Sequence, residues 1–144
     1  MNAPTISRIL GLLFLVAGIA GFIPWIAPAA PFDAPVVTWD TAYRLIGGIF
    51  PVNIAHDALH ILFGLVGLLA AVRFSSAVAY ARVVTWVYLV LIVLGLIPIT
   101  STLFGVAPIY GWDVALHAVV LLVALYAGYG RGSQEEVEPA TLAP

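Results

Sequence analysis

Cysteine is absent from this 144-residue chain, which excludes disulfides and metal sites built on thiolates. Lysine is absent as well. The 5 basic residues are all arginines that stand apart in the sequence, so there is no basic cluster of the kind that binds nucleic acid. Only 8% of the residues are charged, whereas a soluble domain usually has about 25%. With 63% hydrophobic residues, the composition indicates an integral membrane protein whose main partner is the lipid bilayer.

Four long apolar runs are present, and each is close to the roughly 20 residues that cross a bilayer as a helix. They cover about residues 6–26, 52–72, 83–99 and 113–129. The sequence therefore predicts an all-α integral membrane protein whose residues 1–130 form a bundle of four transmembrane helices. Residues 131–144 are polar and acidic, so we expect them to form a disordered cytoplasmic tail.

The connections between these runs differ in length. Residues 27–50 form a long loop, in which Thr38 or Thr41 is expected to cap a short helix that ends at Gly47 and Gly48. Residues 75–82 are expected to form a short loop, which makes the second and third helices antiparallel neighbours.

The placement of the arginines predicts the orientation of the bundle. With the N-terminus in the cytoplasm, Arg44 alone lies outside, which agrees with the positive-inside rule. The other arginines then lie inside: Arg8, Arg73, Arg82 and Arg131. We therefore expect a protein of the bacterial inner membrane with both of its termini in the cytoplasm.

The two halves of the chain resemble each other in spacing. The interval from Pro51 to His60 equals the interval from Pro108 to His117, and a Leu-His pair ends both segments. A Gly-x-Ile-Pro segment also ends both the first and the third apolar run. The pattern favours a bundle built as two helical-hairpin repeats, with His60 and His117 at equal depth near the outer face.

Polar side chains interrupt the second apolar run in a helical pattern. Their positions are i, i+3, i+4 and i+7, which places them on one stripe of a helix: Asn53, His56, Asp57 and His60. Gly64 and Gly67 continue this stripe, where a second helix could approach closely. Asp113 and His117, spaced i, i+4, form a second polar patch in the fourth run. Because polar groups are costly in lipid, we expect the two patches to face each other.

These residues also carry a family resemblance. The pattern Phe-Pro-Val-Asn-x-x-His-Asp-x-x-His at residues 50–60, followed by Trp-Asp-x-x-Leu-His at residues 112–117, resembles a bacterial family of four-helix membrane proteins known only as a domain of unknown function. The resemblance covers nearly the whole chain except the first long loop and the acidic tail. It implies four transmembrane helices, but it implies no activity. The chain departs from the family pattern at Asp57, where we expect asparagine.

A metal site is one hypothesis for the polar patches. Histidines spaced i, i+4 present two imidazoles on one face of a helix, as helical zinc sites do. His56, His60, Asp113 and His117 together would make a set suited to zinc, iron or copper(II). Asn53 and Asp57 would then hold these ligands in position without binding the metal themselves.

Three other hypotheses stay open. The polar groups could simply hydrogen-bond across the helices and hold the bundle together, as in a non-catalytic accessory subunit of a larger membrane complex or a homo-oligomer. A b-type haem could take His60 and His117 as axial ligands. A proton or small-solute path is the last, although the third run is almost wholly apolar, with Thr85 near its start, so a path through the membrane is not expected. The sequence does not predict an enzyme, because it has neither a serine set beside the histidines nor a glycine-rich phosphate loop.

Overall fold

The computed structural model describes residues 1–134 and contains four α-helices within that range, which confirms the all-α prediction. The helices and their bounds are α1 (Ala3–Ala20), α2 (Ile54–Ala70), α3 (Phe74–Leu96) and α4 (Trp112–Tyr129). Three of them, α1, α3 and α4, are long and apolar enough to cross a membrane, and α2 is a shorter apolar helix. At 1.5 Å per residue, the 17 residues of α2 rise about 26 Å, slightly less than the bilayer core of about 30 Å.

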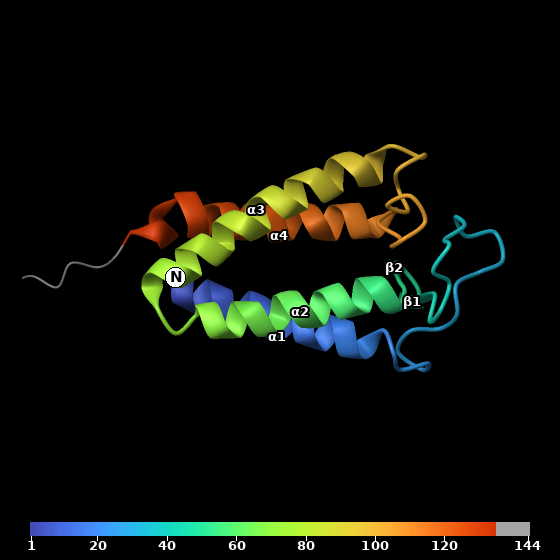
Figure 1. Ribbon diagram of the computed structural model, residues 1–144, viewed down its shortest axis with the longest axis horizontal. Helices are drawn as coiled ribbons and strands as arrows, with labels where there is room; N and C mark the ends of the chain where they lie inside the picture. The colour runs from blue at the N-terminus through green and yellow to red at the C-terminus, as the bar shows by residue number, and fades with distance from the viewer. Residues whose placement is uncertain (135–144) are drawn as a thin grey trace, which may run out of the picture.

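The helices pack as two antiparallel pairs (Figure 1). One pair consists of α1 and α2, and the other consists of α3 and α4. In Figure 1, α3 starts beside the end of α2 and crosses diagonally toward α4. The contact between the pairs is therefore looser than the contact within each pair. The likeness between the two halves of the sequence remains a prediction.

Glycines allow the close contact between α1 and α2. A side chain on Gly11 would come within 2.9 Å of the Gly64 carbonyl oxygen, and one on Gly64 would come within 2.8 Å of the Gly11 carbonyl oxygen. The backbones of the two helices therefore approach each other directly, as small residues permit in membranes. This confirms the expectation that another helix packs at Gly64, and identifies that helix as α1.

The predicted start of the third helix at Val83 was wrong, as was its end at Ile99. The helix begins at Phe74, so the residues expected to form a short loop are its first turns. Ala77 and Ala81 are fully buried in this segment, because their small side chains let α3 enter the core. Arg82 lies within the helix, and its Nε donates a hydrogen bond of 2.9 Å to the Gly128 carbonyl of α4.

The predicted short helix after Thr38 or Thr41 was also wrong. This part of the loop forms an antiparallel hairpin of β1 (Arg44–Ile46) and β2 (Phe50–Val52). Gly47, Gly48 and Ile49 connect the strands. The two glycines have φ of +60° and +76°, which glycine adopts without steric cost. The Gly-Gly pair is therefore a hairpin turn and not a helix stop.

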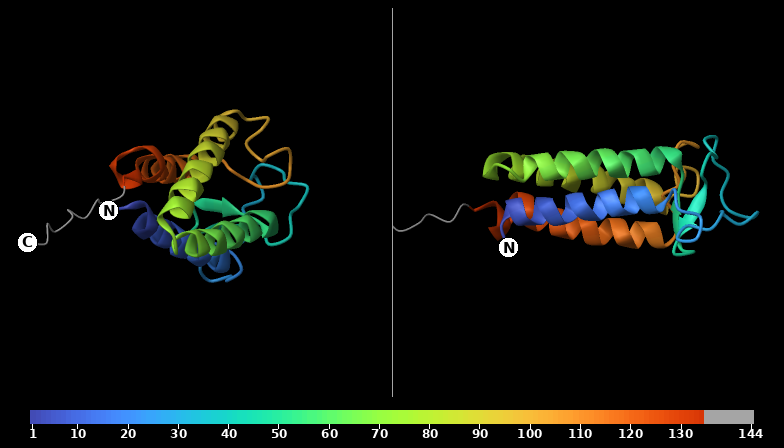
Figure 2. Two further views of the ribbon diagram at one scale, coloured as in Figure 1. Left: turned by 60° about the vertical axis from the view of Figure 1, so that its left-hand side comes forward. Right: turned by 90° about the horizontal axis from the view of Figure 1, so that it is seen from below.

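The two ends of the bundle differ in structure. The first long loop with its β-hairpin lies at one end, together with the second long loop, residues 97–111 between α3 and α4. The N-terminus lies at the other end (Figure 2). A 3₁₀ turn (Arg131–Ser133) follows α4. The rest of the predicted acidic tail, residues 135–144, lies outside the described residues. Large apolar side chains remain exposed along the outside of the helices, for example Leu69 and Leu122, as expected where helices face lipid.

Candidate functional site

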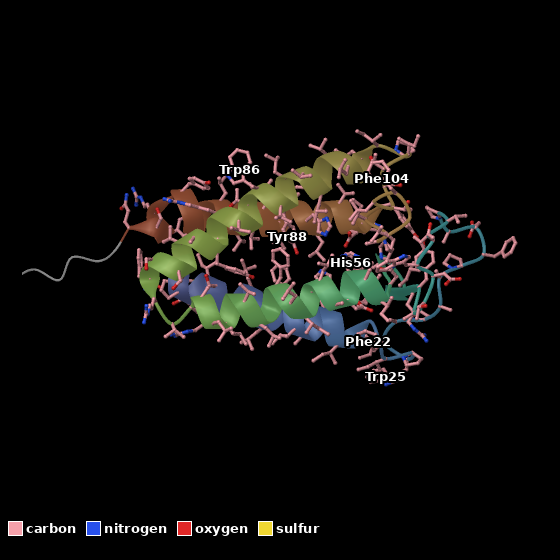
Figure 3. The ribbon with its side chains drawn as sticks, in the orientation of Figure 1. Phe22, Trp25, His56, Trp86, Tyr88 and Phe104 are labelled. Atoms are coloured by element: carbon pink, nitrogen blue, oxygen red, sulfur yellow. The ribbon has the colours of Figure 1, made fainter. Side chains whose placement is uncertain are left out.

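Three of the predicted ligands meet between α2 and α4, near the end of the bundle that carries the loops. His56 lies in the first turn of α2 and points into the space between the helix pairs (Figure 3). Asp113 and His117 lie on α4, and one ligand atom from each of the three residues lies within 4.8 Å of the other two. Their exposed fractions are 5% for His56, 2% for Asp113 and 2% for His117, so the group is shielded from its surroundings.

Asn53 fixes the position of His56. Its side-chain oxygen accepts a hydrogen bond of 3.0 Å from the His56 backbone N–H, which caps α2. Its amide nitrogen donates to the carbonyls of Trp39 and Val106, at 2.7 and 2.8 Å. Asn53 thus ties both long loops to the start of α2. These hydrogen bonds account for its place in the polar stripe, and the one with His56 is made to the backbone N–H and not to the imidazole.

Asp113 and His117 form a pair on the inner face of α4. Asp113 Oδ2 lies 3.3 Å from His117 Nε2, one helical turn away. Gly111 precedes the helix with φ of +65°, a left-handed turn that glycine favours. Asp113 occupies the first turn, where the helix dipole stabilises a negative charge.

The side chains of this group have polar atoms without hydrogen-bond partners among residues 1–134. They include Nδ1 of His56, Oδ2 of Asp113, and both ring nitrogens of His117. The His117–Asp113 pair is close, but it does not satisfy the geometry of a hydrogen bond. A buried polar atom left unpaired costs about 1–3 kcal/mol. The group is therefore not a network of mutually satisfied hydrogen bonds.

His60, the fourth predicted ligand, lies beside this group in a layer of packed aromatic rings. It packs against His56 on one side and Phe14 of α1 on the other, with centroid separations of 4.5 and 5.8 Å. Tyr88 of α3 belongs to the same layer. Its ring centroid lies 5.7 Å from that of Phe14 and 4.9 Å from that of His117. His60 is half-buried, and its Nδ1 is buried without a partner in the described chain. All four helices contribute a ring to this layer.

Asp57 lies on a different side of α2. Its fully buried carboxyl packs against Gly21, where any side chain would overlap it. Gly18 likewise lies against the backbone of Asp57. The polar stripe therefore divides: His56 faces α4, whereas Asp57 faces the end of α1.

Tyr88 and Phe14 were not foreseen from the sequence as part of the site. Both lie within apolar runs, where an aromatic residue is more often core than site. The hydroxyl of tyrosine, in the middle of an otherwise apolar third run, is the only signal that could have singled out Tyr88. Phe14 gives no such signal, since its role depends on the packing of α1 against α3.

A cavity of about 240 Å³ adjoins the three histidines. Its floor is formed by His56, His60 and His117, and its walls are apolar side chains of α2, α3 and the second loop. A second cavity of about 220 Å³ is lined mainly by α1 and α4. His60, Tyr88 and His117 line both cavities.

Tyrosines join the two long loops outside this layer. The hydroxyl groups of Tyr43 and Tyr110 lie 2.8 Å apart, and Tyr43 also donates to the Pro35 carbonyl at 2.9 Å. Burial raises the pKa of Tyr43 above its usual value, so it stays neutral at physiological pH. This pair holds the first loop against the segment that leads into α4.

Comparison with known families agrees with this architecture. A family model described as Domain of unknown function (DUF4383) matches residues 5–130, which include α2, α3, α4, all but the first two residues of α1, and every residue of the site. No match was found among curated proteins or among solved structures.

Proposed function

The chain belongs to the DUF4383 family, whose function is unknown, and for this member we propose a membrane protein that binds one divalent transition-metal ion through His56, Asp113 and His117. The observation that carries the proposal is the convergence of their ligand atoms within 4.8 Å of one another in a buried layer. Two imidazoles and one carboxylate are ligands that zinc and non-haem iron(II) accept. Copper(II) also takes nitrogen and oxygen ligands.

The separation of the ligand atoms supports this assignment. Zinc binds nitrogen and oxygen at about 2.0–2.2 Å, so ligands in a tetrahedral site stand about 3.4 Å apart. The longest separation here, at most 4.8 Å, exceeds that value by little more than 1 Å, and His117 Nε2 and Asp113 Oδ2 already lie 3.3 Å apart. A small rotation of the His56 side chain would bring the three ligand atoms to the separations of a tetrahedral site.

Electrostatics favours a bound cation as well. A buried carboxylate is costly in a low-dielectric layer unless a positive charge lies close to it. Within residues 1–134, Asp113 has no Arg partner at ion-pair distance. A divalent ion would neutralise Asp113 and would also satisfy the unpaired nitrogens of His56 and His117.

The unpaired atoms also weigh against the structural alternative. If the polar patches only held the helices together, their atoms would pair across the bundle, as Asn53 does with Trp39 and Val106. In the described chain neither ring nitrogen of His117 makes such a bond. If no metal binds, we would interpret the protein as an accessory subunit whose polar cluster is purely structural.

A haem is less well supported than a metal ion. His60 and His117 line the same cavity, as haem ligation would require, but its volume is about 240 Å³. An apolar cavity of about 150 Å³ holds a single benzene ring, whereas a porphyrin contains four pyrrole rings. The space between the imidazoles therefore suits one small ring better than a macrocycle.

The orientation in the bacterial inner membrane is part of the proposal. The loop end, with the metal site below it, would face outward, and the end that carries Arg8 and Arg73 would face the cytoplasm. The site would then lie within about two helical turns of the outer surface, since His56 is in the first turn of α2.

Metal analysis of the purified protein tests the proposal. We expect about one equivalent of zinc or iron per chain, and Asp113→Asn should reduce it at least tenfold because a neutral amide is a poor ligand. Asp57→Asn is the matched control, since Asp57 is an equally buried carboxyl that faces α1. Absence of metal from the wild-type protein after reconstitution, or equal loss from both variants, would contradict the assignment.

A further inference from the structure

The cavity beside the histidines has the size of a substituted ring. Its volume is about 240 Å³, and an apolar cavity of about 150 Å³ already accepts benzene. Phe63 and Tyr88 supply aromatic walls, and Val87 and Leu91 of α3 supply aliphatic ones. A six-membered ring with a few small substituents fits this space.

Polar atoms on the cavity floor lack partners. His117 lines the cavity and is only 2% exposed. Its Nδ1 has no hydrogen-bond partner among the described residues. Nδ1 of His60, which also lines the cavity, is in the same state within residues 1–134. Each imidazole can donate or accept one hydrogen bond at such an atom. Because these nitrogens are themselves buried, an oxygen substituent in the cavity bonds to them once the imidazoles rotate toward it.

An apolar groove continues from this cavity along the same pair of helices. Its volume is about 490 Å³, and Phe63 lines both spaces. Along α2 the lining passes from Leu59 to Ala70, and along the antiparallel α3 it passes from Leu91 back to Ser76. The two spaces, together called the α2–α3 crevice, thus lie end to end along α2 and α3. These two helices diverge toward the loop end of the bundle (Figure 1).

The lining carries no charged side chain in either space, as far as the described residues extend. An anionic phosphate head group would meet no arginine there, so a phospholipid is disfavoured. The groove is flanked by side chains on the lipid-facing surface, such as Leu62 at 54% exposed and Val83 at 55% exposed. A ligand therefore reaches the cavity from within the bilayer.

We propose that the α2–α3 crevice binds a lipid-soluble quinone or quinol. The ring lies in the histidine-lined cavity with its oxygen substituents at His60 and His117, and the alkyl or isoprenoid tail lies in the apolar groove. This site goes beyond the metal site, because the cavity lining includes His56 and His117 but not Asp113.

Binding of a benzoquinone with a decyl tail tests the proposal. The protein is reconstituted in lipid nanodiscs, and the quinone retained is measured against empty discs. We expect saturable binding of about one molecule per chain. The same ring with a methyl group in place of the tail should bind at least tenfold more weakly, and decanol should not compete. Binding no greater than to empty discs, or equal competition by decanol, would overturn the proposal.

Cavity-filling variants locate the binding. Val87→Phe should weaken binding at least tenfold, whereas Val90→Phe places the same ring on the lipid-facing side of α3, where Val90 is 54% exposed. Leu91→Phe, with Leu89→Phe as its control, provides a second pair if the first variant does not fold. Unchanged binding in both folded cavity variants would refute the location.

The metal and quinone proposals fail separately. Asp113→Asn should lose metal but keep quinone binding, because Asp113 does not line the cavity. Loss of quinone binding in this variant, with its helical content intact, would contradict a site independent of the metal. Quinone binding without any metal in the wild type would refute the metal assignment alone.

Discussion

Residues of one polar stripe serve different purposes in this protein. Asn53 is fully buried and makes three hydrogen bonds, so it acts as a structural clamp. His56 is one turn further along α2, and its Nδ1 is unpaired within the described chain. Asp57, its neighbour, faces α1. The difference between a clamp and a candidate ligand thus lies in hydrogen bonding, which spacing alone does not reveal.

Substitution of Asn53 should reveal its clamp role in the free energy of unfolding. Asn53→Ala removes the cap of α2 and leaves the Trp39 and Val106 carbonyls without this donor, so we expect a loss of about 2–4 kcal/mol. Asn2→Ala removes the exposed cap of α1 and should cost about 0.5–2 kcal/mol. Detergent-titrated unfolding measures both. Equal losses would show that the two loop contacts contribute nothing.

The sequence predicted three ligands that the structure brings together, for reasons of spacing. His56 begins a helix after a clear cap, and Asp113 and His117 share a helix face at i, i+4. The sequence could not show that His60 turns toward Phe14 of α1. That orientation depends on how four helices cross, and no single helix encodes the crossing.

Among the elements, the α1–α2 pair depends on glycine more than on polar contacts. Gly11 and Gly64 meet backbone to backbone, and Gly67 lies against Gly11 and the Tyr80 hydroxyl. The sequence predicts the glycine stripe on α2, because i, i+3 spacing places Gly64 and Gly67 on one face. It does not predict which helix packs against this stripe, since glycine allows any helix to approach closely.

A methyl group at Gly64 should force α1 and α2 apart. Its carbon would lie 2.6 Å from Leu15 Cγ and 2.8 Å from the Gly11 carbonyl oxygen, so Gly64→Ala should destabilise the protein by about 1–3 kcal/mol. Ala58→Val enlarges an exposed position of the same helix and should change the stability little. Unfolding of both variants in detergent measures the difference. A neutral Gly64→Ala would mean that the helices do not pack this closely.

The predictions for two elements, the start of α3 and the β-hairpin, were wrong because their local sequence signals were ambiguous. Ser75, Ser76 and Arg82 are typical of a loop, yet this segment is helical because Ala77 and Ala81 bury a small-residue face against the core. Gly47 and Gly48 can end a helix or turn a hairpin. Here the strand pairing of Arg44 with Val52 selects the hairpin.

At the scale of the whole molecule, the two ends of the bundle differ in structure. The loop end holds the site under a cover joined by Tyr43 and Tyr110, and the other end carries the first turns of α1 and α3. The apolar outer surface suits lipid, and it suits the helices of another membrane subunit or a second copy equally well. The number of helices followed from composition and run length, whereas their pairing across the bundle required the structure.

Cysteine labelling tests the orientation. Ser75 is exposed in the first turn of α3, and Asp33 is exposed in the first long loop. In a chain that contains no other cysteine, Ser75→Cys should react with an impermeant maleimide only after the membrane is opened, and Asp33→Cys should react in intact cells. The reverse pattern would invert the proposed topology.

X-ray absorption spectroscopy of the metal-loaded protein tests the central claim most directly. It reports the ligands around the metal whether or not the protein has an activity. We predict nitrogen and oxygen ligands at about 2.0–2.2 Å with outer-shell scattering from two imidazoles, those of His56 and His117. His60→Phe should leave this spectrum unchanged, because the His60 ring packs against Phe14 and lies outside the ligand set. A first shell without imidazole scattering, or a spectrum that loses a ligand in His60→Phe, would contradict the account.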